Sequence, residues 1–184
     1  MKPGSKAYWL LSLAAVVLAL AAGVAAWLEH RLEQPGARHI AQAQWMTGPG
    51  GSFAPLPPEA VATEGPWQTV ALPHTWQQPL QAVRDTAPRA TWLQVNLDAM
   101  PATPGGLVLY LPRWQTIGRI AVYGDDKLLF RPVGDVVWNG FNHPLWVPLD
   151  AHGTVAAPRL LRLRIDSLGS AGGTVSSLWV GPAE

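Results

Sequence analysis

Short segments in which apolar and polar residues alternate recur along the chain from residue 67 onward. The clearest lies at 161–166, where three aliphatic residues alternate with two arginines and an aspartate. The same alternation occurs at 91–97 and 145–149, and an unbroken apolar run occupies 107–111. Because successive side chains of a β-strand point to opposite faces, a period of two is typical of a strand with one buried face. These segments are therefore predicted to be strands.

Turn signals separate the predicted strands at short intervals. Pro101–Gly105, Gly124–Asp126 and Ser167–Gly173 are rich in Gly, Pro, Asp or Ser, which favour tight turns. About eight short strands are expected between residues 67 and 182, and no segment there has the 3.6-residue period of a helix. The pattern predicts an all-β domain, a two-sheet antiparallel β-sandwich that is most simply a jelly roll.

The N-terminal segment has a different character. Tyr8–Leu28 contains no charged residue and is rich in Leu, Ala and Val. Its length suits a transmembrane helix, aromatic residues stand at both ends, and the lysines before it favour a cytoplasmic N-terminus. The alternative is a cleaved signal peptide, because small residues within 21–26 would permit cleavage. Under either interpretation the remainder of the chain is expected to be exported.

These patterns divide the chain into four segments. Residues 1–7 form a cytoplasmic N-terminus and 8–28 the transmembrane helix. Residues 29–66 are expected to extend this helix briefly and then to form a Pro/Gly-rich spacer. Residues 67–182 form the exported β-sandwich domain.

Composition excludes several classes of protein. Of the 184 residues, 48% are hydrophobic and 14% are charged, which is outside the range of disordered chains. The net charge of +1 and the scattered basic residues give no reason to expect a nucleic-acid partner. The absence of cysteine excludes disulfides and a thiolate nucleophile.

The residue patterns that catalysis would need are also missing. The five histidines lack metal-ligand spacing. The aspartates fall in predicted turns or at strand ends, without a paired acid motif. No nucleophile motif or phosphate-binding loop occurs. We therefore expect no enzymatic activity, no metal and no cofactor.

The ten tryptophans are the most unusual feature of the composition. Two flank the N-terminal apolar segment, and others occupy predicted strands, where packing in the core is expected. Those in loops or at strand ends lie close to amide and cationic side chains, a combination that suits a sugar or a partner surface. The alternative is that these rings close the ends of a small sandwich while the amides cap turns. The candidate ligand-binding residues are Trp76, Arg113, Trp114, Trp138, Asn139, Asn142 and His143.

The order of several short motifs resembles a known family. The motifs are W-x-x-V-x-L-P-x-x-W at Trp67–Trp76, L-Y-L-P-R at Leu109–Arg113, a hairpin at Val122–Asp125, N-x-P-L at Asn142–Leu145 and V-G-P at Val180–Pro182. Together they resemble the periplasmic sensor domains of bacterial membrane histidine kinases and diguanylate cyclases, which are galactose-binding-like jelly rolls. They are more distantly similar to the N-terminal sugar-binding-like domain of β-galactosidase-type glycoside hydrolases.

The resemblance has two departures. The hairpin carries Gly124–Asp125 where relatives carry an asparagine, and the sequence ends at Glu184 where relatives continue into a second membrane helix and a signalling domain. No kinase or cyclase residues are present. The resemblance thus implies an input module without its output domain.

Three functions follow as hypotheses. The first is a single-pass inner-membrane protein whose periplasmic domain senses a small ligand, such as a carbohydrate, or a periplasmic protein. The second is an accessory carbohydrate-binding domain of a glycoside hydrolase. The third is a structural envelope or dimerisation module, in which the partner is a second copy of the chain.

Overall fold

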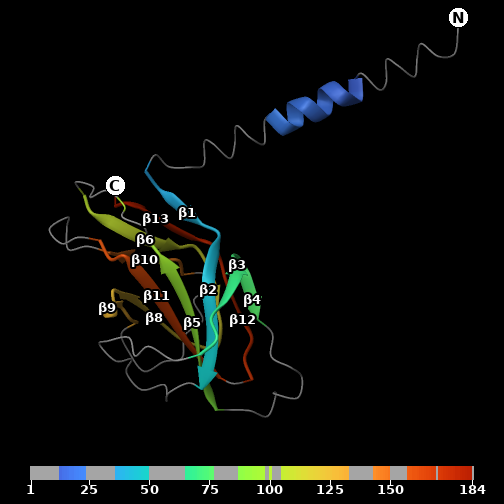
Figure 1. Ribbon diagram of the computed structural model, residues 1–184. Coiled ribbons are helices and arrows are strands. Elements are labelled where there is room, and N and C mark those ends of the chain that lie inside the picture. Colours follow the sequence, from blue (N-terminus) through green and yellow to red (C-terminus); the bar gives the residue numbers. More distant parts are fainter. Residues whose placement is uncertain are drawn as a thin grey trace, which may run out of the picture. The chain divides into compact units, whose positions relative to one another are not determined.

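The computed structural model describes two units of the chain, Met1–Gly36 and Ala37–Glu184. The residues described are 13–23, 36–49, 65–76, 87–97, 100, 105–132, 143–149, 157–168 and 170–183. In the first unit, residues 13–23 are helical (Figure 1). They are part of the expected membrane helix at 8–28, whose two ends lie outside the described residues. No helix within the described residues has the length and apolar character needed to span a membrane.

The described residues of the second unit form strands, as the alternating pattern predicts. The strands are β1 (Arg38–Ile40), β2 (Gln42–Pro49), β3 (Gln68–Ala71), β4 (His74–Trp76), β5 (Pro88–Asn96), β6 (Leu107–Leu111), β7 (Trp114–Gln115), β8 (Gly118–Gly124), β9 (Lys127–Phe130), β10 (Leu145–Pro148), β11 (Leu160–Leu168), β12 (Gly173–Val175) and β13 (Leu178–Pro182).

The strands form two large antiparallel sheets and one small one (Figure 1). The four-stranded sheet has the order β1-β13-β6-β10, and the six-stranded sheet has the order β3-β2-β5-β11-β8-β9. A third sheet of order β4-β12-β7 completes the set. The prediction of an all-β domain with antiparallel sheets, consistent with a β-sandwich, is confirmed, whereas its assignment as a jelly roll stays a prediction.

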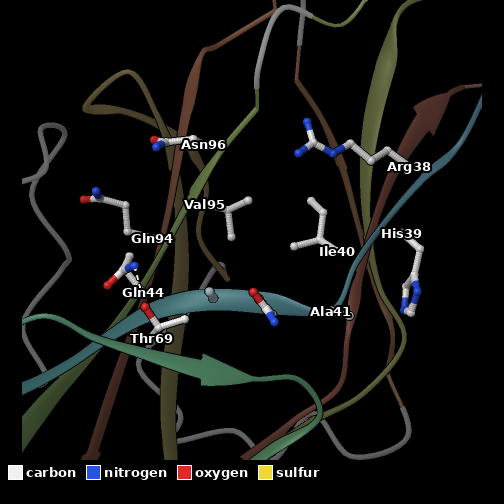
Figure 2. A pocket seen from close by; sticks show the side chains of 11 residues that line it. Arg38, His39, Ile40, Ala41, Gln44, Thr69, Gln94, Val95 and Asn96 are labelled. Atoms are coloured by element: carbon white, nitrogen blue, oxygen red, sulfur yellow. Dashed lines mark hydrogen bonds between the residues drawn. The ribbon is translucent and has the colours of Figure 1, made fainter.

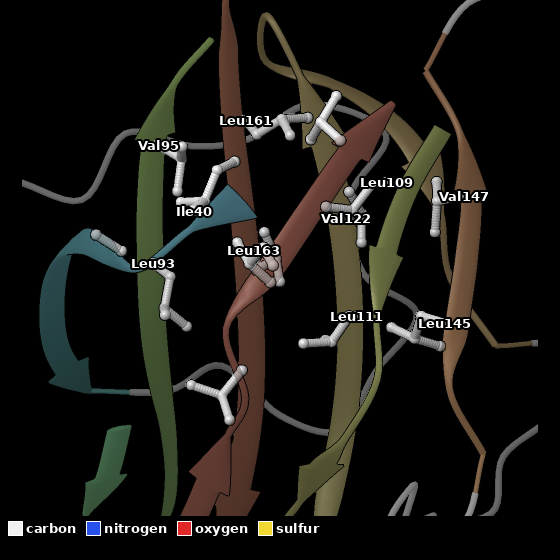
Figure 3. Packing of buried hydrophobic residues seen from close by; sticks show 14 of the residues in the cluster. Ile40, Leu93, Val95, Leu109, Leu111, Val122, Leu145, Val147, Leu161 and Leu163 are labelled. Atoms are coloured by element: carbon white, nitrogen blue, oxygen red, sulfur yellow. The ribbon is translucent and has the colours of Figure 1, made fainter. Parts of the chain in front are cut away.

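Strand β11 occupies a central position in the six-stranded sheet. It is nine residues long and pairs with β5 on one side and β8 on the other. Its aliphatic side chains Leu161, Leu163 and Ile165 are fully buried, as the sequence predicts. Figure 3 shows side chains of β5 and β11 facing those of β6 and β10, so that the main core fills the space between the two large sheets.

The outward side of β11 is also covered in part. Asp166 is fully buried and accepts two hydrogen bonds from Arg164, at 2.7 and 3.0 Å. The Arg164 guanidinium also lies 5.5 Å from the centre of the Trp92 ring. Burial raises the pKa of Asp166, although the hydrogen bond and charge of Arg164 oppose this rise. The prediction that the aspartates lie in turns or at strand ends is therefore wrong for Asp166, which is buried within β11.

Residues 38–49 correct the predicted boundary of the β domain. Within the spacer expected at 29–66, residues 38–40 and 42–49 are strands, because β1 and β2 pair with β13 and β5. Ile40, Ala43 and Trp45 contribute buried side chains to the main core. The burial of these apolar residues explains why the segment joins the sheets.

The position of Leu163 leads to a test of the packing. Replacing this fully buried side chain leaves a cavity in the centre of the sandwich. We expect Leu163→Ala to lower the free energy of unfolding by about 2–5 kcal/mol, measured by urea denaturation. Ile117, whose side chain is 54% exposed, gives the control: Ile117→Ala should change stability by no more than about 0.5 kcal/mol. Equal effects of the two substitutions would contradict the described core.

Candidate functional site

A cleft lies where the chain crosses from one large sheet to the other. β1 belongs to the four-stranded sheet and β2 to the six-stranded sheet, so the crossing occurs at Ala41. The Ala41 carbonyl accepts a hydrogen bond of 2.8 Å from the backbone N–H of Leu72, which ties the crossing to the end of β3. The cleft beside it has a volume of about 420 Å³ (Figure 2).

Polar, uncharged side chains dominate one side of this cleft, which we call the amide cleft. They come from three neighbouring strands: Gln42 and Gln44 of β2, Thr69 of β3, and Gln94 and Asn96 of β5. Arg38 and His39 of β1 and the apolar residues Ile40 and Val95 complete most of the remaining lining.

Strand register explains why these amides gather. Gln44 and Gln94 are direct cross-strand partners, so their side chains emerge on the same face of the six-stranded sheet. The Gln44 side-chain amide donates a hydrogen bond of 2.9 Å to the Thr69 hydroxyl. The side-chain carbonyl oxygen of Gln94 accepts a hydrogen bond of 2.9 Å from the Arg162 guanidinium. These two bonds hold the middle of the cleft in place.

Two other amides remain available to a ligand. Gln42 and Asn96 are exposed, and their side chains make no hydrogen bond to any residue that the structure describes. Each side-chain amide offers two N–H donors and a carbonyl acceptor. The cleft can therefore donate hydrogen bonds to a ligand and accept them from it.

The described lining of the cleft contains no pair of carboxylates for acid–base chemistry. The three aspartates within the described residues all hold the scaffold together. Asp125 accepts from the backbone N–H groups of Arg159 and Leu160, Asp126 is paired with Arg162, and Asp166 is paired with Arg164. No described residue lining the cleft carries a carboxylate. Across the described part of the chain, no group of three or more His, Asp or Glu side chains could hold a metal ion.

The residues predicted from the sequence to bind a ligand lie elsewhere. Trp138, Asn139 and Asn142 are outside the described residues. Trp114 is fully buried in the main core, so the exposed ring that was expected for stacking is absent, and this part of the prediction is corrected. Its burial follows from β7, which pairs with β12 and turns the indole inward.

The other predicted residues form two separate groups. Arg113 and His143 are exposed at the same end of the β6–β10 pair, just beyond the partners Leu111 and Leu145. Trp76 is half-buried and lines a second depression of about 510 Å³. Neither group borders the amide cleft.

Trp45 connects Trp76 to a histidine. Its ring centre lies 5.1 Å from that of Trp76 and 4.5 Å from that of His74, against which it packs edge-on. Burial in this contact lowers the pKa of His74. Trp45 lies on β2, so the cluster joins the small sheet to the six-stranded sheet.

The cleft residues of β2 carried a sequence signal that went unused. Gln42, Ala43, Gln44 and Trp45 alternate between polar and apolar, which is the pattern of a half-buried strand. Because these residues fall within the spacer predicted at 29–66, their alternation was not interpreted as a strand. Gln94 and Asn96 did lie on the polar side of a predicted strand, but nothing local indicates which strand lies beside them.

Comparison with known proteins gives matches among solved structures alone. No protein-family model matches the sequence, and no curated protein matches it. The matched structures include a β-glucuronidase from Faecalibacterium prausnitzii (13% identity, TM-score 0.44, covering 73% of this chain and 22% of that one). A glycosyl hydrolase family 2 member from Bacteroides cellulosilyticus is 9% identical, with a TM-score of 0.49 and coverage of 79% and 20%. A β-glucuronidase from Ruminococcus gnavus is 12% identical, with a TM-score of 0.47 and coverage of 79% and 28%.

The chain spans less than a third of the length of each of these enzymes. All three are glycoside hydrolases, the class to which the sequence shows its more distant resemblance. The resemblance to sensor domains gains no support from these matches and stays a prediction. Similarity at this level carries no argument about what the chain binds.

The lowered pKa of His74 gives a pH test of the cluster around Trp45. Because the folded state disfavours the protonated ring, the unfolded state binds more protons as the pH falls below about 6.5, the unfolded pKa. The free energy of unfolding should therefore decrease as the pH falls from about 6.5 through the lower pKa that His74 has in the folded protein. We expect the melting temperature to decrease less between pH 7.5 and pH 5.0 in His74→Gln than in the natural protein. The same loss in both proteins would contradict the burial of this ring.

Proposed function

We propose that the β domain binds carbohydrate without altering it chemically, and that the amide cleft is the binding site. The observation that carries this proposal is the pair of exposed amides, Gln42 and Asn96, on a cleft lined by further amides and a hydroxyl group. A sugar presents hydroxyl groups that both donate and accept hydrogen bonds, and side-chain amides match them in both respects.

The polar lining disfavours other ligand classes. A fully apolar ligand would bury the amides of Gln42 and Asn96 without partners, at a cost of about 1–3 kcal/mol each. A nucleic acid would require several basic side chains along its backbone, and Arg38 is the one Lys or Arg in the described lining.

A purely binding role fits the carboxylates that the structure describes. Glycoside hydrolysis uses two carboxyl groups about 5–10 Å apart on either side of the scissile bond. Asp125, Asp126 and Asp166 are instead bonded to Arg159, Arg162 and Arg164 respectively. We therefore propose that this domain recognises carbohydrate and does not cleave the glycosidic bond.

The proposal is tested by binding measurements on the full 184-residue chain. Gln42→Ala and Asn96→Ala each remove one or two hydrogen bonds of about 0.5–1.5 kcal/mol. We therefore expect each variant to bind a recognised saccharide about three- to tenfold more weakly. The measurement is isothermal titration after a glycan screen has identified a ligand.

Gln115→Ala is the matched control, since it removes an exposed amide from β7, outside the cleft. It should leave the affinity unchanged. Binding that resists both cleft substitutions, or a screen in which no saccharide binds, would overturn the assignment.

We further propose that the N-terminal segment places the domain outside the cytoplasmic membrane. Tyr8–Leu28 is free of charge, residues 13–23 are helical, and Leu13, Val16, Val17, Leu18 and Leu20 are each more than half exposed. A helix with this many exposed apolar side chains gains stability in a lipid environment.

Reporter fusions after residue 184 test the location in a bacterial host. We expect an alkaline phosphatase fusion to be active and a fluorescent-protein fusion to be dark, because export through the Sec route favours the first reporter. The mass of the isolated protein then distinguishes an uncleaved anchor, which keeps residues 8–28, from a cleaved signal peptide. The reverse reporter pattern would show that the domain stays in the cytoplasm.

A further inference from the structure

The outward face of the four-stranded sheet carries one aromatic residue on each strand. Trp179, Tyr110 and Trp146 each stand between two buried aliphatic residues of their own strands, so their side chains point away from the core. Strand pairing aligns them: His39 is the partner of Trp179, Trp179 of Tyr110, and Tyr110 of Trp146. These four residues form a single row across the whole sheet, which we call the aromatic row.

The rings of this row are accessible. Trp146 is 55% exposed, in contrast to Trp92 at 3% and Trp114 at 0%. His39 is also exposed, while Tyr110 and Trp179 are half-buried. Burying large aromatic side chains is a major source of folding stability, so a protein that leaves such a row in solvent forgoes that contribution.

The rings make contact in two pairs. His39 stacks on Trp179, with ring centres 4.3 Å apart and planes inclined by 24°. Tyr110 and Trp146 lie 5.6 Å apart with planes inclined by 59°. These contacts restrict the rotamers of the side chains, which lowers the entropy that a ligand would have to remove on binding.

The polar edges of the rings decide which kind of ligand fits. Each ring carries a nitrogen or a hydroxyl group, and none of these groups makes a hydrogen bond to any residue the structure describes. The next outward positions on β13, β6 and β10 are Gly181, Val108 and Pro148, which bear no charge. Apolar ring faces with free polar edges suit a ligand that has C–H faces and hydroxyl edges, as a sugar ring does.

The row and the amide cleft meet at β1 but face opposite sides of this strand. Arg38 and His39 are successive residues of this strand, and Figure 2 shows Arg38 reaching over the cleft while His39 points away from it. His39 borders the cleft and also begins the row. Three strand spacings of about 4.8 Å give the row a length of roughly 14 Å, which exceeds the width of one sugar ring.

We propose that the aromatic row binds successive units of a linear oligosaccharide, as a second carbohydrate site separate from the amide cleft. This inference rests on the carbohydrate-binding function proposed for the domain and names the ligand class as a linear chain of sugars. A monosaccharide then binds at the cleft, whereas a longer chain also binds along the row. The affinity should increase with chain length until the row is filled.

The test compares saccharides of one linkage and different lengths. The probes are the mono-, tri- and hexasaccharides of the β-1,4-linked glucose, xylose and N-acetylglucosamine series, titrated against the full chain in a detergent without a sugar headgroup. We expect the hexasaccharide of the recognised series to bind at least tenfold more tightly than its monosaccharide. Trp146→Ala and Trp179→Ala should each weaken hexasaccharide binding about tenfold and leave monosaccharide binding unchanged.

Two further variants separate stacking from general apolar contact. Trp146→Leu keeps an apolar side chain without an aromatic face, and it should lose as much hexasaccharide affinity as Trp146→Ala. Ile117→Ala removes an equally exposed apolar side chain outside the row and should change nothing. Because Trp146 and Ile117 are mostly exposed, the variants at these two positions are expected to keep the melting temperature of the natural protein within a few degrees.

The outcomes distinguish failure of the row from failure of the cleft. Unchanged hexasaccharide affinity in Trp146→Ala, with monosaccharide binding still sensitive to Asn96→Ala, would overturn the row alone. No binding of any saccharide would overturn both assignments. A Trp146→Ala protein that binds glycans normally but loses self-association, or loses adsorption to phosphatidylcholine vesicles, would show that the row is a protein or membrane contact and would also overturn the proposal.

Discussion

The register of β11 against its two neighbours is the constraint on which the described domain depends. Each residue of this strand is paired with one residue of β5, and most are also paired with one of β8. A shift of one residue would turn Leu163 and its aliphatic neighbours toward solvent and bring arginine side chains into the core. The burial of that aliphatic face therefore fixes the register. The same register places Gln94 on the outward face of β5, opposite Gln44 of β2, where it helps to form the amide cleft.

The four-stranded sheet follows the same rule with a different result. Its inward residues, such as Leu109 and Val147, complete the core (Figure 3). Its outward residues gather four rings into one row, because antiparallel pairing aligns positions that are far apart in the sequence. The amides of the cleft and the rings of the row thus come from positions that the core leaves free.

Local patterns predicted the interior better than the surface. The strands at 91–97, 107–111, 145–149 and 161–166 were visible as runs of alternating or apolar residues, because burial of one face leaves that signature in the sequence. The tight turn at Asp125 and Asp126 was also visible, and both residues have the positive φ angles that such a turn requires. Trp114 was placed wrongly because its neighbours are polar, and pairing between β7 and β12 is what turns its ring inward. The aromatic row was missed for a related reason: Trp146 and Trp179 each look like one ring in a strand, and pairing alone brings them together.

Tryptophan indole signals in a two-dimensional ¹H–¹⁵N NMR spectrum test the central claim directly, namely that carbohydrate binds on the outward surfaces left free by the core. The natural protein contains its own references, because Trp92 and Trp114 are buried whereas Trp146 is exposed. Adding the hexasaccharide of the recognised series should shift the indole signals of Trp146 and Trp179, together with the side-chain amide signal of Asn96. The signals of Trp92 and Trp114 should stay in place. Shifts confined to the buried indoles, or a spectrum that does not change at saturating saccharide, would contradict the account.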